Sequence, residues 1–525
     1  MNAVMNASKR GADEACDVSV YDVRNCFDNL WLSECINDIY EAGLTNDKLC
    51  LLYYSNRHAQ VAIKNSKGIS ERMSIENTVM QGTVWAGLMC TSTMDKLGKQ
   101  AYGDPNLMYK YKNNVFVPPL EMVDDVICAS KCGSQVVASN TAVTTFVKLK
   151  KLQLGEKKCA RIHIGGKNIQ KCPEIFVNGK YINESEKEKY LGDYLTKYAN
   201  PKATILDRQQ KGNGILSNIR AILEDIPLGS RRLEVGLTLR EAWFINGTLY
   251  NSEVWCSYTS NDLKSLNILD RKILKLVLQS HSKVPSEMLY LETGCLPLTD
   301  VVTVRRLMYL HTILQRPKTE IVRKVFSEQK NNPCKGDWVT LVEADMAELD
   351  INFDQIEGCS VEIFRKQIVG KIRNRAFQEL RKIQEGHDKV RCIFFRDLSG
   401  PQNYLFNMQF SNKLRSLLFN LRCKSVKNIK DNFHRKYKEN LFCPFSCENI
   451  IDSQEHLLVC PGIKKHLNIE HLEVMNRVRY EHLFGEPLEQ YEAVKAFHTI
   501  LKVRDRLLDK TRRPAYHGNN SGPLG

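Results

Sequence analysis

The sequence has no long apolar run. None of its uncharged apolar stretches reaches the roughly 18–20 residues that a helix needs to cross a bilayer. The first residues (MNAVMNASKRGADEA) lack the continuous apolar core of a secretory signal. Internal repeats and low-complexity tracts are missing too, which argues against a solenoid array or a compositionally disordered chain. These absences predict ordinary folded domains with no membrane partner.

Acidic residues are the scarcer charged class. The 525 residues include 60 Asp and Glu against 75 Lys and Arg, which gives a net charge of +15. Such a surplus favours a polyanionic partner, nucleic acid or an acidic membrane, although a merely soluble basic protein is the simpler alternative. Hydrophobic residues make up 43% of the chain, as in globular proteins. At roughly 100–200 residues per domain, the length predicts three or four domains.

The cysteines are numerous but mostly isolated. Without a secretory signal, all 18 are expected to be reduced, intracellular thiols. Most stand singly among apolar residues, as Cys90, Cys128 and Cys159 do, and core packing is their expected role. One group near the C-terminus has metal-ligand spacing.

The order of strand and helix signals predicts an α+β fold. Strands are expected at 17–22, 59–64, 120–123, 126–129, 161–164 and 174–182, and helices at 33–43, 84–99 and 137–153. This order suits an antiparallel sheet with helices on one face and not a Rossmann alternation. Beyond about residue 205 helical periodicity dominates, and residues 328–337 form a polar break that predicts a linker.

Three carboxylates stand at the ends of predicted strands. Asp124 and Asp125 lie between two short apolar runs, and Asp22 ends the strand 17–22. Two like charges in a buried hairpin are costly unless a cation compensates them, whereas an exposed turn is the alternative for an Asp pair. Nucleotidyl transfer uses two divalent cations roughly 3.5–4 Å apart, held by a few rigid carboxylates. Asp22, Asp124 and Asp125 are therefore candidate ligands of two Mg²⁺ ions.

Five short motifs resemble those of non-LTR (LINE-type) retrotransposon reverse transcriptases. They are Asp22-Val-Arg-Asn-Cys-Phe27-Asp28 (motif A), Gln81-Gly82-Thr83-Val84-Trp85 (motif B), Met122-Val-Asp-Asp-Val126 (motif C), Lys157-Lys158-Cys159 (motif D) and Tyr190-Leu191-Gly192 (motif E). Their order and separations carry the resemblance, which runs from about residue 17 to residue 465. Motif C departs from the family at Met122-Val123, where an aromatic residue or Phe-Ala is usual. Motif B departs at Trp85-Ala86, close to the usual position of a Pro.

The resemblance implies an RNA-directed DNA polymerase with two Mg²⁺ ions, an RNA template, a DNA primer and deoxynucleoside triphosphates. Asp22 and Asp124 would be the principal metal ligands, assisted by Asp125. Phe27 would abut the sugar 2′ position of the incoming nucleotide, unless it is only a core aromatic side chain. Lys158 would protonate or neutralise the leaving pyrophosphate, unless it is only a solvated charge.

The other motifs would contact template and primer. Gln81 and Gly82 would open a helix where the backbone closely approaches the template and the incoming nucleotide. The hairpin with Tyr190, Leu191 and Gly192 would grip the primer end. Only 21 residues precede Asp22, so the resemblance predicts that the fingers segment is missing and the chain is N-terminally truncated.

The resemblance also predicts a domain order after the palm. The expected regions are a palm at 1–200, a helical thumb at 205–325, a basic helical region at 338–435, a zinc knuckle at 436–470, and a helical C-terminal segment with a polar tail at 471–525. Basic thumb side chains would contact phosphates, unless each is only part of a solvated helix face. They are Arg208, Lys211, Arg220, Arg231, Arg232 and Arg240.

A cysteine–histidine group has the spacing of a zinc site. Its members are Cys443, Cys447, His456 and Cys460, and the last two are one helical turn apart. Zinc takes four tetrahedral thiolate or imidazole ligands, so the group predicts one Zn²⁺ ion; three unrelated thiols and a core histidine are the alternative. Non-LTR elements carry a similar CCHC knuckle, which implies nucleic-acid contact here.

Two other functions fit the sequence less well. A catalytically inactive nucleic-acid-binding remnant would use only the thumb and knuckle, whereas Asp22, Asp124 and Asp125 are intact. An RNA polymerase or intron maturase would share the palm but not the CCHC group. Residues 470–525 contain no convincing endonuclease motif. The polymerase is expected in the cytoplasm when translated and in the nucleus when acting on DNA, and the sequence predicts no oligomeric state.

Overall fold

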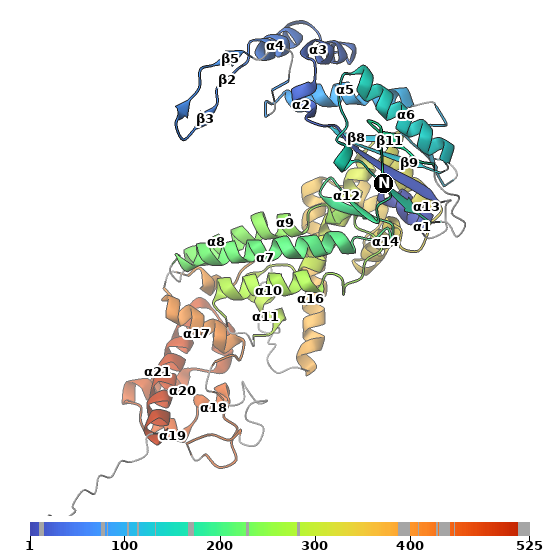
Figure 1. Cartoon of the computed structure of the whole chain (residues 1–525). Helices are drawn as coiled ribbons and strands as arrows, with labels where there is room; N and C mark the ends of the chain where they lie inside the picture. The colour runs from blue at the N-terminus through green and yellow to red at the C-terminus, as the bar shows by residue number, and fades with distance from the viewer. Residues whose placement is uncertain are drawn as a thin grey trace, which may run out of the picture. The chain divides into compact units, whose positions relative to one another are not determined.

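The computed structural model divides the chain into two compact units (Figure 1). It describes residues 1–9, 15–74, 79–80, 82–101, 104–112, 115–131, 133–165, 173–226, 230–280, 284–386, 400–407, 409–426, 429, 441–445 and 447–512. Unit 1 comprises residues 1–207, 251–262 and 305–361. Unit 2 comprises residues 208–250, 263–304 and 362–525. The predicted thumb, 205–325, therefore contributes to both units.

A four-stranded antiparallel sheet organises unit 1. Its strand order is β10-β1-β9-β8, with β10 at Ala160–Ile164, β1 at Cys16–Asp22, β9 at Asp125–Ser130 and β8 at Leu120–Met122. In β1, Val18 lies opposite Ala129 of β9 and Ile162 of β10. The same register places Asp22 opposite Asp125 at one end of the sheet. The α+β architecture predicted from the sequence is confirmed.

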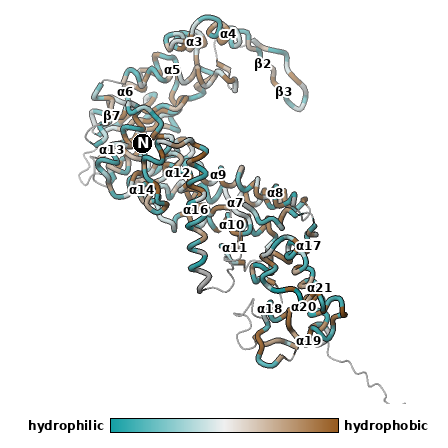
Figure 2. Tube along the Cα trace, turned by 180° about the vertical axis from the view of Figure 1, so that it is seen from behind, coloured by the Kyte–Doolittle hydropathy of each residue, from teal (hydrophilic) through white to brown (hydrophobic). Residues whose placement is uncertain are grey.

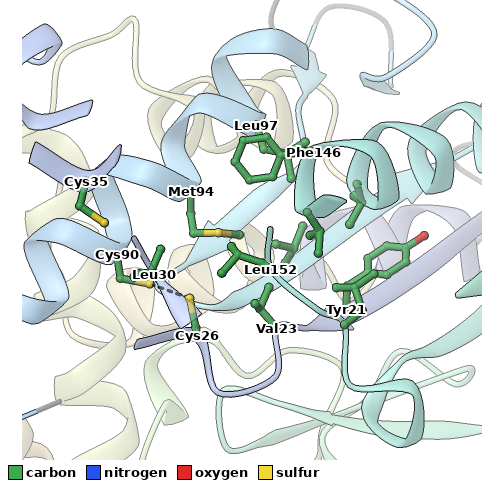
Figure 3. Close-up of a cluster of buried hydrophobic side chains, with 14 of the residues drawn as sticks. Tyr21, Val23, Cys26, Leu30, Cys35, Cys90, Met94, Leu97, Phe146 and Leu152 are labelled. Atoms are coloured by element: carbon green, nitrogen blue, oxygen red, sulfur yellow. Dashed lines mark hydrogen bonds between the residues drawn. The ribbon is translucent and has the colours of Figure 1, made fainter. Parts of the chain in front are cut away.

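Side chains of the sheet alternate between two buried faces. Tyr21, Val126 and Cys128 pack with helices α5 (Ala86–Ala101) and α6 (Gly133–Leu149) in one core. Figure 3 shows part of this core, including Tyr21. On the opposite face, a second core joins β1, β9 and β10 to helix α1 (Asn2–Lys9) and to the hairpin β6–β7 (Tyr109–Tyr111 and Val115–Val117). Both faces are thus covered, which explains why β1 and β9 are buried at almost every position, including the polar Asp17 and Ser19 of β1.

The remaining elements of unit 1 are short helices and strands, and some of them belong to the later segments 251–262 and 305–361. Helices are α2 (Cys26–Asn29), α3 (Leu32–Glu41), α4 (Asn46–Arg57), η1 (Glu156–Lys158), η3 (Ser252–Val254), α13 (Ile321–Asn331), α14 (Trp338–Glu348) and α15 (Phe353–Glu357). Paired strands are β2 (Gln60–Val61) with β5 (Met73–Ser74), β3 (Lys64–Asn65) with β4 (Gly68–Ile69), β11 (Phe176–Val177) with β12 (Lys180–Tyr181), and β13 (Lys187–Tyr190) with β14 (Asp193–Thr196). Helices α7 (Lys202–Glu224) and α12 (Leu298–Gln315) contribute residues to both units.

The polar stretch 328–337, predicted as a linker, is packed into unit 1. Asp337 is fully buried and accepts a hydrogen bond of 2.9 Å from the Asn6 amide. The Lys112 ammonium also reaches Asp337, at 3.3 Å, and donates to the carbonyl of Asn332. The linker prediction was wrong because these polar groups find partners within the unit rather than in water.

Unit 2 is helical in the residues described. Its helices are α8 (Ser230–Leu239), η2 (Arg240–Ile245), α9 (Asn246–Thr248), α10 (Lys264–Leu278), α11 (Ser286–Thr293), α16 (Val361–Gly386), η5 (Asn403–Leu405), α17 (Asn412–Arg422), α18 (Gln454–Leu457), α19 (Pro461–Lys464), α20 (Ile469–Arg477), η7 (Tyr480–Phe484) and α21 (Pro487–Arg512). Polar and apolar residues are interleaved along the helices (Figure 2). None of the described helices has the length and apolarity required to cross a bilayer.

Three of the basic residues expected to contact phosphates are buried in unit 2. Arg240 binds both carboxylate oxygens of Asp270, at 2.6 and 3.0 Å. Arg232 donates to the carbonyls of Leu223 and Ile226 near the end of α7. Arg208 is also buried. Phosphate contact is therefore wrong for these three, whereas Lys211, Arg220 and Arg231 are exposed.

Candidate active site

The end of the palm-like sheet brings three carboxylates together. Asp22 closes β1 and faces Asp125, the first residue of β9. Asp124 forms the turn between β8 and β9, and its carbonyl accepts a hydrogen bond of 3.2 Å from the Val23 amide. The strand register therefore brings the ends of segments 17–22 and 120–129 together, as the motif order predicted.

The turn that carries the Asp pair has a strained backbone. Val123, directly before Asp124, has φ of 63°, in the left-handed region. A β-branched residue is rarely found there because its side chain crowds the backbone, and such strain costs on the order of 1–3 kcal/mol. The packed strands on either side hold the turn in place, as strained turns at functional sites require.

The electrostatics of the carboxylates show mutual repulsion. Burial raises the pKa of Asp125, and the charges of Asp124 and Asp22 raise it further. The one cation bound to Asp22 among the described residues is Lys158, whose ammonium donates to Asp22 Oδ1 at 2.8 Å. That hydrogen bond raises the pKa of Lys158, so the ammonium stays charged beside the carboxylates. Lys158 itself remains exposed, and it neutralises only part of the negative charge.

Gly155 fixes the position of Asp22, a role that was not predicted from the sequence. Its amide donates to the Asp22 carbonyl at 2.8 Å. A Cβ atom on Gly155 would lie 2.8 Å from Asp22 Oδ2, closer than real Cβ contacts allow. The only sequence signal was a glycine just before the Lys157-Lys158 pair. Glycine is required here by close approach, not by its φ.

A cleft of about 810 Å³ opens beside Asp22 and Asp124. Phe27 lines it while also packing against the core of Figure 3, so its cleft and core interpretations are compatible. Basic side chains on its wall suit a polyphosphate. They are Arg24, Lys157, Lys158 and Lys180, of which the sequence analysis had singled out Lys158.

The structure describes all of the Tyr190–Gly192 motif but only part of the motif that begins at Gln81. Gln81 lies outside the described residues. Gly82 precedes helix α5 with φ of 88°, and a Cβ there would meet none of the described atoms within 4 Å. Tyr190 ends β13, and the hairpin turn at Leu191 and Gly192 connects it to β14. Burial raises the pKa of Tyr190, with Asp125 as the largest electrostatic contributor.

Glu121 of β8 gives the sheet a pH-dependent stability. Burial, with the charge of Asp95, raises the pKa of Glu121 to about 8. An unfolded glutamate titrates near about 4.3, so between these values the folded state binds more protons than the unfolded state. The unfolding free energy should therefore fall as pH rises from about 5 to 8. Hydrogen exchange of β9 amides should show this slope, and Glu121→Gln should remove it; an unchanged slope would contradict the assignment.

The cysteine–histidine group converges within unit 2. The ligand atoms of Cys443, Cys447, His456 and Cys460 all lie within 4.8 Å of one another. Cys460 Sγ is 3.7 Å from Sγ of both Cys443 and Cys447. His456 Nε2 is buried without a hydrogen-bond partner among the described residues. One imidazole and three thiols are a donor set that zinc prefers.

The local fold explains this convergence. Ser453 accepts a hydrogen bond from the His456 amide and so caps α18, which carries the histidine. Cys460 is the N-cap of α19. Burial lowers the pKa of His456, which favours the neutral imidazole that binds metal. Burial raises the pKa of Cys443 to about 12, so without a metal its thiol stays protonated.

Comparison with known protein families gives a match in the first part of the chain. Residues 5–195 match the family described as reverse transcriptase (RNA-dependent DNA polymerase). No curated protein matches the chain. Among solved structures, the chain is similar to apo telomerase from Candida tropicalis truncated from its C-terminal domain, with 17% identity and a TM-score of 0.26 over 38% of this chain and 36% of that chain.

Two further telomerase structures align over longer segments. Telomerase from Candida tropicalis in complex with a TWJ fragment of telomeric RNA has 13% identity and a TM-score of 0.31, covering 68% of this chain and 50% of that chain. The corresponding complex from Candida albicans has 10% identity and a TM-score of 0.28, covering 66% and 53%. The chain spans about half the length, or less, of these matched chains.

Proposed function

We propose that the chain, whose residues 5–195 match the reverse transcriptase family, is the RNA-directed DNA polymerase of a non-LTR retrotransposon. The observation that carries the proposal is the convergence of Asp22, Asp124 and Asp125 beside a basic cleft. The motifs shared with LINE-type elements and the Cys443–Cys460 group support the assignment to that class. Its substrates would be an RNA template, a DNA primer and deoxynucleoside triphosphates. Such an enzyme works on DNA in the nucleus after synthesis in the cytoplasm.

The carboxylates fit magnesium. Their oxygens are the hard ligands that Mg²⁺ prefers, and their mutual repulsion calls for cations. Two bound Mg²⁺ ions supply activation of the primer 3′ hydroxyl and charge neutralisation at the leaving pyrophosphate. Asp22 and Asp124 would be the principal ligands, with Asp125 beside them.

The surrounding residues would position the substrates. Lys158 holds a proton next to Asp22, where it can be given to the pyrophosphate or can neutralise its charge. Phe27 lines the cleft as a bulky wall that would exclude a ribose 2′ hydroxyl. Gln81 and Gly82 would approach the template and the incoming nucleotide, and the Tyr190–Gly192 hairpin would hold the primer end.

Primer extension tests this function. The full chain, supplied with a DNA primer annealed to an RNA template, should incorporate deoxynucleotides with Mg²⁺ and stop when EDTA is added. Ribonucleotides should be incorporated poorly because of Phe27. RNA binding without any synthesis would instead support a nucleic-acid-binding remnant and reject the polymerase proposal for this chain.

Gly155→Ala should impair metal binding through Asp22. The added Cβ would lie 2.8 Å from Asp22 Oδ2 and push the carboxylate away. Because a displacement of about 1 Å can cost roughly a hundredfold in rate, we expect extension to fall ten- to hundredfold. Mn²⁺ affinity, measured by electron paramagnetic resonance, should weaken in parallel. The control is Gly214→Ala, whose Cβ would meet none of the described atoms within 4 Å. Equal effects of both variants would reject the positioning role.

We also propose that Cys443, Cys447, His456 and Cys460 bind one Zn²⁺ ion. The four ligand atoms are close enough to surround one ion, and His456 Nε2 has no other partner among the described residues. The ion would replace thiol protons and join α18, α19 and the preceding loop. A knuckle of this kind would contact nucleic acid.

Zinc analysis of the full chain tests the second site. The purified chain should contain one zinc per molecule, and Cys447→Ser should lose it because serine is a poor zinc ligand. Cys50→Ser, which replaces an exposed free cysteine, should retain the ion. Zinc-free wild-type protein in reducing buffer, or full zinc content in Cys447→Ser, would contradict the assignment.

A further inference from the structure

A second cavity, of about 320 Å³, lies within unit 2. Its walls come from α10, α11, the segment that follows α11, the start of α12, and α16. None of its lining residues belongs to the reverse transcriptase domain. Its volume is within the range of about 300–1,000 Å³ that is common for small-ligand sites.

One part of the lining is apolar and aromatic. Tyr290 and Phe377 supply rings, and Leu296 supplies an aliphatic surface. The Tyr290 hydroxyl donates to Asp270 Oδ2 at 3.0 Å, which fixes this ring. Arg381 lies over the Phe377 ring, 4.8 Å from its centroid. Flat rings favour a planar ligand that can stack.

Two arginines in the lining retain unused hydrogen-bond donors. Arg271 Nη1 donates to Ser286 Oγ at 3.2 Å, and Arg373 Nη2 donates to the Gly294 carbonyl at 3.4 Å. A guanidinium has five N–H groups, so most of these groups have no partner among the described residues. Within the described residues, neither arginine forms an ion pair, whereas nearby Arg240 pairs with Asp270 at 2.6 Å.

Two carboxylates in the same lining are also uncommitted. Glu287 of α11 and Glu379 of α16 line the cavity, and neither lies within ion-pairing distance of a described Lys, Arg or His. The cavity therefore presents spare donors and spare acceptors together with aromatic rings. A simple anion such as phosphate would use the arginines but would be repelled by the two glutamates.

We propose that this cavity binds a single unstacked nucleotide base. The edge of a base carries donors and acceptors side by side: ring nitrogens and carbonyls accept from arginine, and exocyclic amines donate to glutamate. Stacking on aromatic side chains is the usual companion of such contacts in single-stranded RNA recognition. Bases with an exocyclic amine should therefore bind better than uracil. The inference concerns unit 2 alone and does not rest on polymerase activity.

Nucleotide titration of the full chain, followed by saturation-transfer NMR, tests this proposal. GMP, AMP and CMP should bind saturably, UMP more weakly, and inorganic phosphate should not compete. Arg373→Ala should weaken binding about tenfold or more, since a hydrogen bond to a charged group is lost. Arg365→Ala removes the same charge from an exposed position of α16 outside the cavity and should change affinity less than twofold.

A competition experiment distinguishes whether single-stranded RNA or a free nucleotide supplies the base. If single-stranded RNA supplies it, a short RNA oligomer should displace the bound nucleotide and an abasic oligomer of equal length should not. Failure of the RNA to compete would assign the site to a free nucleotide. No saturable binding, competition by phosphate, or equal losses in Arg373→Ala and Arg365→Ala would overturn the proposal. Arg271→Gln provides a second test if Arg373→Ala fails to fold.

Discussion

Asp124→Asn should reduce deoxynucleotide incorporation by about a thousandfold or more. The substitution keeps the shape of the side chain at the β8–β9 turn but removes a charge that would hold the metal ions. Loss of several kcal/mol of transition-state stabilisation corresponds to a rate change of this size. Single-nucleotide incorporation on an RNA template, followed in a quenched time course, measures the effect.

RNA binding by Asp124→Asn should stay almost unchanged. Binding rests on Lys and Arg contacts to phosphate and should weaken with salt in the same way in both proteins. Asp47→Asn, which makes the same chemical change at an exposed position of α4, is the matched control and should retain full activity. Activity that survives Asp124→Asn, or is lost equally in Asp47→Asn, would show that the carboxylates were misassigned.

Arg422→Met should cause the largest loss of stability. Arg422 and Glu292 are both fully buried, and Arg422 Nε lies 2.7 Å from Glu292 Oε1. Arg422 also donates to the Leu483 carbonyl at 2.8 Å, so it connects α17 with two other segments of unit 2. Removing one partner of a buried pair typically costs about 3–5 kcal/mol, because the other charge stays buried and uncompensated.

The loss in Arg422→Met should depend on pH. Burial raises the pKa of Glu292, and Arg422 partly opposes that rise. Without the arginine the pKa should rise further, so the folded state binds a proton that the unfolded state releases. The variant's unfolding free energy should therefore fall as pH rises from about 5 to 8. Hydrogen exchange of α11 and α17 amides measures this locally, which avoids assuming one transition for the whole chain.

A double variant and an exposed arginine are the controls for this pair. Glu292→Gln combined with Arg422→Met should recover much of the loss, since no uncompensated charge remains. Arg477→Met removes an exposed arginine that lies 3.9 Å from Glu473 on α20, and it should cost less than about 1 kcal/mol. Equal losses in Arg422→Met and Arg477→Met would contradict the account of the buried pair.

The sheet and its carboxylates were predictable because their signals are local. Alternation in 17–22 and two short apolar runs around Asp124 and Asp125 specify strands and a turn without knowledge of distant contacts. Antiparallel pairing then places Asp22 opposite Asp125. The cysteine–histidine group was predictable for the same reason, since its spacing alone brings the donors within reach.

Features that depend on distant packing could not be predicted. Neither helix α1 nor hairpin β6–β7, which cover the second face of the sheet, was predicted from the sequence. Arg240 looked like a surface cation because nothing near it in sequence reveals Asp270, thirty positions later. Gly155 carried no distinctive signal either, because its role arises from an approach to Asp22, far away along the chain.

Counting bound Mn²⁺ tests the central claim most directly. Electron paramagnetic resonance should detect two Mn²⁺ ions per chain when primer–template and a non-hydrolysable deoxynucleoside triphosphate are present, because Asp22, Asp124 and Asp125 would hold both ions. Asp22→Asn and Asp124→Asn should each abolish the pair, whereas Asp47→Asn should keep it. A chain that binds no Mn²⁺ under these conditions, or binds it equally in all three variants, would contradict the account.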